Sequence, residues 1–175
     1  MQRRALLSGL VSGTVVMAGC TDNTFSNETR DVYNPTGMAT IRPLDEPILQ
    51  HGMSTGTEQY LYAGMFHPGD TLAVTDSPDA DRFSEAIDDL SEGEFALFTN
   101  LRTAASAPAY FWPTSSDWEN GRLKIKLERR TSSYDGSGEE VVGMALTIFD
   151  HQGDRPTGAD VIFPSGATIP IGQVD

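Results

Sequence analysis

The only thiol in the chain belongs to Cys20, which directly follows Ala18 and Gly19. With one cysteine, no intramolecular disulfide is possible. The thiolate form of cysteine is a nucleophile, and a lone exposed thiol on a secreted protein is a reactive liability. We therefore expect Cys20 to be covalently modified; the alternative is a buried or free thiol.

The residues before Cys20 have the make-up of an export signal. Arg3 and Arg4 form a short positive region, and the fifteen residues from 5 to 19 carry no charge. This run is too short to span a membrane, which takes about 20 apolar residues. Its length and its small-residue end are typical of a cleaved signal. Residues 1-19 are therefore predicted to be a cleaved export signal.

The arginine pair before a mildly apolar run resembles a twin-arginine signal, and Met17-Ala18-Gly19-Cys20 resembles a lipobox. Gln2 stands where the twin-arginine pattern has Ser or Thr, so the general secretory route remains an alternative. The lipobox resemblance implies that Cys20 is lipidated and holds the protein at the cell surface, anchored to the membrane. One short acyl chain anchors only marginally, so stable attachment needs two chains on this residue.

The chain is strongly acidic, with 25 Asp and Glu against 12 Lys and Arg, and Lys124 and Lys126 are its only lysines. Such lysine-poor acidity resembles that of proteins from extreme halophiles, where the Debye length falls to about 3 Å at 1 M salt. The alternative is an acidic or calcium-rich extracellular domain of an ordinary organism. Together, the signal, the lipobox and the acidity resemble a haloarchaeal secreted lipoprotein. The resemblance implies where the protein is located but does not imply an activity.

The charge argues against a nucleic-acid partner, because a phosphate backbone is bound by a basic stripe that releases counterions. The nearest candidate is the segment 122–130, whose cations alternate with Leu123, Ile125 and Leu127. That alternation predicts that the cations form the solvent face of one strand. Direct binding to an anionic membrane surface is disfavoured on the same ground.

The aromatic residues Tyr110, Phe111, Trp112 and Trp118 are the strongest candidates for a binding surface, and they include both tryptophans. They lie in the segment 103–120, which two prolines and several small residues predict to be a long loop. Exposed there, Tyr110, Trp112 and Trp118 would stack on sugar rings or anchor a protein partner. The alternative is that Phe111 and Trp118 cover the end of the core.

No catalytic or metal motif is recognisable. The three histidines, His51, His67 and His151, have no HExxH or HxH spacing, and each lies in a predicted turn. A nucleophile elbow is absent. Two acidic clusters, at 76–81 and 135–140, offer oxygen ligands for calcium but lack the spacing of a calcium loop. Capping and solvation explain both without an ion, and calcium binding is the alternative. We expect no cofactor.

One helix and seven or so strands must position these residues. Ser77 is a good N-cap, Pro78 suits the first turn, and Phe83, Ile87 and Leu90 fall on one apolar stripe. Gly93 is the expected stop. The expected strands are 58–66, 71–75, 94–102, 121–130, 141–149, 160–163 and 168–171.

The predicted fold is mainly β with one helix (α+β), an antiparallel β-sandwich or a partly open barrel. A single β-rich globular domain is expected over 38-175. Residues 20-37 are polar and predict a lipidated, flexible tether. Asn27 begins a glycosylation triplet, Asn27-Glu28-Thr29, in that tether.

Two functions follow from these expectations. The first is a membrane-anchored extracytoplasmic lipoprotein whose domain binds an envelope protein or glycan partner without catalysis. The second is a small extracytoplasmic hydrolase or metal-dependent enzyme that uses acidic residues and a histidine. For the second function, a histidine must lie within reach of two carboxylates in a cleft.

Overall fold

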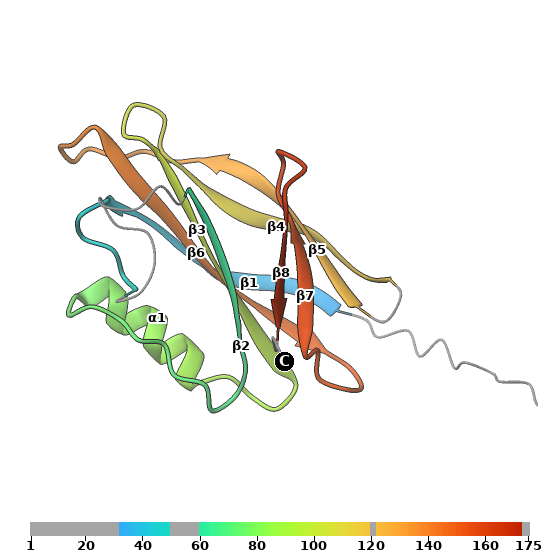
Figure 1. Cartoon of the computed structure of the whole chain (residues 1–175). Helices are drawn as coiled ribbons and strands as arrows, with labels where there is room; N and C mark the ends of the chain where they lie inside the picture. Colours follow the sequence, from blue (N-terminus) through green and yellow to red (C-terminus); the bar gives the residue numbers. More distant parts are fainter. Residues whose placement is uncertain (1–31, 50–59, 120–121, 173–175) are drawn as a thin grey trace, which may run out of the picture.

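The computed structural model describes residues 32–49, 60–119 and 122–172. They form three layers: one helix, a first sheet and a second sheet (Figure 1). The first sheet has the strand order β1-β6-β3-β2 and the second has the order β4-β5-β7-β8. The elements are β1 (Val32–Pro43), β2 (Leu61–Phe66), α1 (Pro78–Asp88), β3 (Glu94–Ala104), β4 (Ala109–Glu119), β5 (Arg122–Thr131), β6 (Glu140–His151), β7 (Gly158–Ile162) and β8 (Thr168–Gly172).

The predicted sandwich with one helix is confirmed, and the two sheets do not close into a barrel. All pairs in the first sheet are antiparallel. In the second sheet β5 and β7 run parallel, which differs from the antiparallel expectation. A long connection through β6 lies between these two strands, as a parallel pair requires.

The central strands β3 and β6 are buried on both faces, as their continuous apolar runs predict. Ala96 and Phe98 of β3 pack in the cluster that includes the helix. Phe95 and Leu97, which alternate with them, pack against the second sheet. The first sheet is therefore covered on one face by α1 and on the other by the second sheet.

Helix α1 begins and packs as its sequence predicts. Ser77 is the N-cap, and its Oγ accepts a hydrogen bond of 3.2 Å from the backbone N–H of Ala80. Phe83 and Ile87 are buried against the first sheet. The helix ends at Asp88, ahead of the expected stop at Gly93.

Aromatic side chains fill the space between the two sheets. Phe95 and Phe149 stack with ring centroids 5.0 Å apart. Phe111 of β4 meets Phe163 edge to face at 4.9 Å. Each such pair adds roughly 0.5–1.5 kcal/mol beyond the burial of its surface. Phe111 therefore belongs to the core between the sheets.

Three local expectations are corrected. The segment 103–120 contains a strand, β4, because Pro113 occupies a bulge on an edge strand, where a missing N–H is tolerated. Within 71–75 only Val74 forms a bridge, to Leu49, so no strand forms there.

Strand β1 starts at Val32, inside the range 20-37 that is predicted to be the tether. Its polar residues suit a strand that pairs with β6 alone and keeps one edge free of a strand partner.

The two sheets come into close backbone contact where β6 crosses the start of β4. A Cβ atom at Gly143 would lie 1.8 Å from the carbonyl oxygen of Ala109, far inside van der Waals contact. Only glycine leaves room for the backbone of β4 at this point.

We therefore predict that Gly143→Ala lowers the free energy of unfolding by roughly 1–3 kcal/mol, the usual effect of an overpacked core. Urea denaturation measures the change. Gly93→Ala is the matched control, because its Cβ would have its nearest neighbour at 3.9 Å. Equal effects of the two substitutions would contradict the close approach of the sheets.

Candidate functional site

Six side chains on the outer side of the second sheet form a surface that we call the basic–aromatic face. Two come from β4 and four from β5: Tyr110, Trp112, Arg122, Lys124, Lys126 and Arg130. Strand β5 alone holds five of the chain's 12 basic residues, and both lysines are among them. The basic residues of an acidic protein are therefore concentrated on one strand.

Simple alternation places the cations of β5 on this face. Leu123, Ile125 and Leu127 are buried in the core between the sheets. Arg122 and Lys126, which alternate with them, are exposed. Successive side chains of a strand point to opposite sides, so the cations of 122–126 share the outer surface. The predicted solvent face of this strand is confirmed.

The aromatic part of the face comes from β4 and touches the cations of β5. Tyr110 pairs with Arg130, and Trp112 pairs with Glu128 in the strand register. The two rings are T-shaped, with centroids 6.3 Å apart. The guanidinium of Arg130 lies over the indole of Trp112 at 5.2 Å, within the range of a cation–π interaction. Both rings are half-buried, so part of each remains open to solvent.

Carboxylates are interspersed among these cations. Arg122 pairs with Asp160 of β7 at 2.9 Å, and Arg130 pairs with Glu128 at 2.7 Å. Exposed ion pairs of this kind contribute about 0–1 kcal/mol each. Lys126 forms no ion pair with any residue in the described ranges. Its ammonium group is available to a ligand.

Trp118 lies on the other side of the same strand. A bulge between Pro113 and Ser115 shifts the pairing of β4 with β5 by one residue. One extra residue reverses the alternation, so Trp118, six residues after Trp112, packs against the core between the sheets. The structure therefore separates the residues proposed for partner binding: Tyr110 and Trp112 face outward, and Trp118 faces inward.

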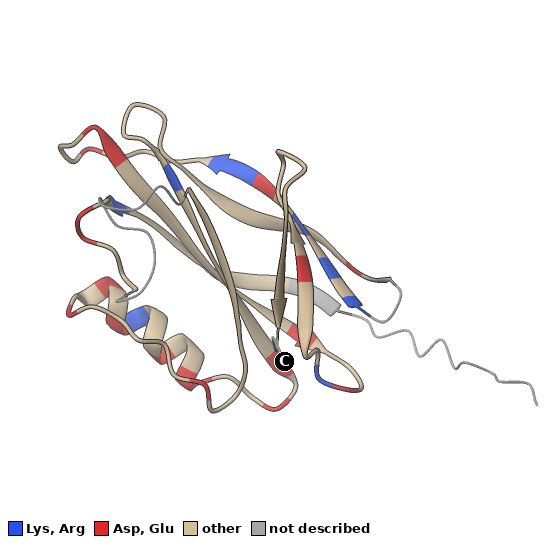
Figure 2. Cartoon of the chain, in the orientation of Figure 1, with Lys and Arg blue, Asp and Glu red and all other residues tan. Residues whose placement is uncertain are grey.

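The helix layer carries the opposite charge. Asp79, Asp81, Glu85 and Asp88 lie on α1 with a single cation, Arg82. Figure 2 shows acidic residues gathered at α1 and the loops and several basic residues along β5, with others on β1, β3 and α1. Since α1 and the second sheet cover opposite faces of the first sheet, the acidic helix and the cation-rich strand β5 lie in opposite outer layers.

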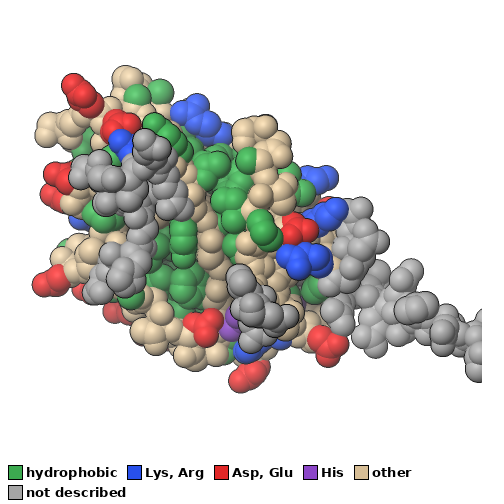
Figure 3. Space-filling view, viewed as in Figure 1, with side chains coloured by type: hydrophobic (Ala, Val, Ile, Leu, Met, Phe, Trp, Pro, Cys, Tyr) green, Lys and Arg blue, Asp and Glu red, His purple; other side chains and the backbone are tan. Residues whose placement is uncertain are grey.

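Partly exposed apolar side chains follow β2, the edge of the first sheet, and are visible at the centre of Figure 3. Tyr62 and Phe66 pack against the cluster that includes the helix. Leu61 and Met65 pack against the core between the sheets. The side chains of β2 therefore cover one edge of the helix-side cluster and of the core between the sheets.

His67 lines a cavity of about 360 Å³ with Asp70 and Arg155 among its neighbours. Its Nε2 lies 2.7 Å from the carbonyl oxygen of Pro156, and its Nδ1 lies 3.6 Å from Asp70 Oδ2. In the neutral ring this geometry makes Nε2–H the donor to the carbonyl. His67 therefore has one ring nitrogen near Asp70, in the turn after β2, and the other near Pro156, in the loop before β7. His51 lies outside the described residues.

His151 is enclosed at the end of β6, with its ring 6.3 Å from that of Phe95. Neither ring nitrogen meets full hydrogen-bond geometry with a group in the described part of the chain, although the backbone of Gly153 lies near enough to affect the ring. Burial lowers the pKa of His151, and the nearby charges of His67 and Arg155 lower it further, while the backbone of Gly153 and the charge of Asp150 oppose them. Protonation of His151 is therefore less favourable in the fold than in the unfolded chain.

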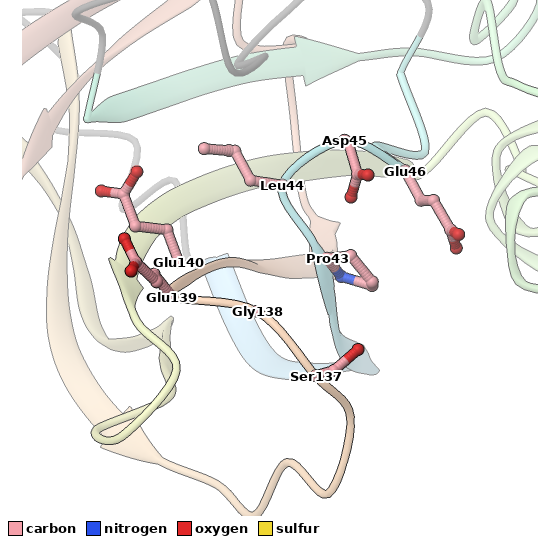
Figure 4. A pocket seen from close by; sticks show the side chains of 8 residues that line it. All are labelled: Pro43, Leu44, Asp45, Glu46, Ser137, Gly138, Glu139 and Glu140. Atoms are coloured by element: carbon pink, nitrogen blue, oxygen red, sulfur yellow. The ribbon is translucent and has the colours of Figure 1, made fainter.

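A second cavity, of about 390 Å³, is bordered by four carboxylates. Figure 4 shows Glu139 and Glu140 on one side of it and Asp45 and Glu46 on the other, without convergence on one point. Glu140 is bound to Arg102, which lowers the pKa of its carboxyl. Among the described residues, no three acidic or histidine side chains come together at a point where one metal ion would bind.

Several predicted residues lie outside the described ranges: Cys20, Arg3, Arg4 and Asn27. Within those ranges, no helix is long and apolar enough to cross a membrane. Comparisons of the chain with family models, with curated proteins and with solved structures give no match.

Sequence reasoning did not single out Lys126 and Arg130 as candidate ligand-binding residues. The concentration of both lysines on one alternating strand was a visible signal. The sequence gives no signal for the position of these residues near Trp112, because that position depends on the pairing of β4 with β5.

The positions of the two tryptophans predict opposite effects on stability. Trp118→Ala removes a ring that packs against the core, and we expect the free energy of unfolding to fall by about 3 kcal/mol. Trp112→Ala removes a surface ring and its cation–π contact, and we expect a loss of about 1 kcal/mol or less. Chemical denaturation of both variants measures the difference. If Trp112→Ala lowers the free energy of unfolding more than Trp118→Ala does, the two tryptophans do not lie on the sides of β4 described above.

The lowered pKa of the half-buried His151 also predicts a pH dependence. Its native pKa lies below the ordinary value of 6.5, so the unfolded chain takes up the proton first as the pH falls. The stabilisation is complete above about pH 6.5 and is lost below it, toward the native pKa. As the pH falls from about 7.5 to about 5, we expect the free energy of unfolding to decrease less for His151→Phe than for the unchanged protein. Parallel pH profiles of unfolding free energy would refute this role.

Proposed function

We propose that the protein is a membrane-anchored extracytoplasmic lipoprotein whose sandwich is a non-enzymatic binding domain at the cell surface. The sequence supports the anchor through Arg3, Arg4 and the Met17-Ala18-Gly19-Cys20 segment. The basic–aromatic face supports binding. In this proposal residues 1-19 are removed, 20-31 link Cys20 to β1, and the described layers are presented to the surroundings.

The observation that carries the binding function is the contact between Trp112 and Arg130 on an open sheet face. An indole that serves only to fill a core would point inward, as Trp118 does. Trp112 instead lies on the outer side with Tyr110 and a row of cations. Tyr, Trp and Arg are the residues that most often dominate the energy of recognition surfaces.

The enzymatic alternative has no comparable observation in its favour. Among the described residues, His67 forms an ion-pair contact with one carboxylate, Asp70, and not with two. No carboxylate in the described ranges forms a hydrogen bond with His151, so none there would orient it as a base. A hydrolase therefore stays a prediction from the sequence alone.

The anchor is tested by Cys20→Ser in the full-length chain, expressed in a host that processes lipoproteins. We expect most of the protein to move from the membrane fraction to the soluble fraction and to lose the mass of its acyl chains, because the acyl chains supply the membrane affinity. Trp112→Ala is the matched control and should remain in the membrane. Retention of Cys20→Ser in the membrane, with unchanged mass, would overturn the anchor.

The binding function is tested separately by capture of envelope components. The Cys20→Ser chain, immobilised on beads, should retain at least one envelope component that Cys20→Ser/Trp112→Ala does not retain. Retention by both chains would overturn the role of the basic–aromatic face, whatever the result for the anchor.

A further inference from the structure

We infer that the basic–aromatic face binds an acidic polysaccharide, a sugar chain that carries carboxylate or sulfate groups. This inference rests on the proposed binding function and names its ligand class. It is drawn from three properties of the face: a row of cations along one strand, two open aromatic rings at one end of that row, and carboxylates set between the cations.

The row of cations fits a polymer with repeated negative charges. Arg122, Lys124 and Lys126 occupy alternate positions of β5 on the outer side. Alternate residues of a strand lie roughly 6–7 Å apart, so the row places cationic groups at regular intervals, with Asp117 and Asp160 opposite Lys124 in the neighbouring strands. Lys126 is exposed and forms no ion pair within the described ranges, so its charge is accessible. A linear chain lying along β5 meets these groups in succession.

The aromatic pair supplies the contacts that a sugar ring needs. Tyr110 and Trp112 meet at an interplanar angle of 82°, so their rings present surfaces in two directions. Pyranose rings have apolar C–H faces, which pack on aromatic rings while the hydroxyl groups stay in water. Arg130 lies against Trp112 at 5.2 Å and brings a guanidinium beside any ring stacked there. A guanidinium forms paired hydrogen bonds with carboxylate or sulfate oxygens.

The interspersed carboxylates favour this ligand over other anions. Glu128 and Asp160 each pair with an arginine of the face. They would repel a continuous anionic surface such as a phospholipid membrane, but they accept hydrogen bonds from sugar hydroxyl groups. The mixture of charges therefore fits a ligand that carries both acidic groups and hydroxyl donors.

A protein partner fits this face less well. The cores of protein interfaces are depleted of lysine, glutamate and aspartate, because these charged groups must be desolvated there, whereas arginine is enriched. Here Lys126 and Glu128 of β5 lie in water across the middle of the sheet. A hydrated polysaccharide leaves water between such groups and itself, so little of that desolvation is required.

The test uses the full-length Cys20→Ser chain in calorimetric titrations at low salt. The probes are polygalacturonate, heparin, neutral dextran, polyglutamate and vesicles that contain phosphatidylglycerol. We expect binding to polygalacturonate or heparin, no binding to dextran, and weakening as salt screens the charges. Binding to dextran at equal strength, or binding only to polyglutamate or only to vesicles, overturns the inference.

Variants then locate the site. Lys126→Glu should weaken binding by about tenfold or more, as expected when a charge-assisted hydrogen bond is lost. Trp112→Ala should weaken it by roughly two- to tenfold. Arg82→Glu, on α1, is the matched control: it makes the same change of net charge on the opposite layer and should have less than about a twofold effect. Equal effects of Lys126→Glu and Arg82→Glu overturn the site.

The outcomes for ligand class and for function are separable. If Trp112→Ala abolishes envelope capture but none of the acidic polysaccharides binds, the ligand class is wrong and the binding function stands. If capture and polysaccharide binding both survive Trp112→Ala and Lys126→Glu, the face has neither role. Far-ultraviolet circular dichroism of each variant establishes that the fold is retained.

Discussion

The double-sided burial of the first sheet determines the arrangement of the rest of the molecule. Strands β3 and β6 bury Phe98 and Met144 toward the helix and Phe95 and Phe149 toward the second sheet. The second sheet can approach closely because Gly143 admits the backbone of Ala109. Once both faces of the first sheet are covered, the outer side of the second sheet is the open sheet face in the described part of the chain. A flat recognition surface on a sheet has to lie there.

Charge follows the same layering. The helix and its neighbouring loops carry acidic residues, and Arg42 of β1 pairs with Asp79 of α1 at 3.0 Å. The second sheet carries the row of cations on β5. A net charge of −13 therefore describes the whole chain but not its second sheet. An acidic protein that presents one basic face keeps its solubility and still has a place for an anionic ligand.

Much of the fold follows from local sequence signals. The Ser77 cap, the stripe of Phe83 and Ile87, and the alternation of β5 are short-range patterns, and each is confirmed. Strand β4 was missed because Pro113 is typical of loops, and its placement on an edge is a property of the sheet. The parallel pairing of β5 with β7 was missed for a similar reason, since partners distant in sequence leave no local trace.

The sequence by itself determined the helix, most of the strands, which side of β5 is buried, and the acidity of the chain. It also supplied the features on which the proposed anchor at Cys20 rests. Tertiary structure decided which tryptophan is presented. Trp112 and Trp118 are six residues apart, so strict alternation would place both on one side. The bulge between Pro113 and Ser115 reverses the alternation, so that Trp118 joins the core and Trp112 faces outward beside Arg130.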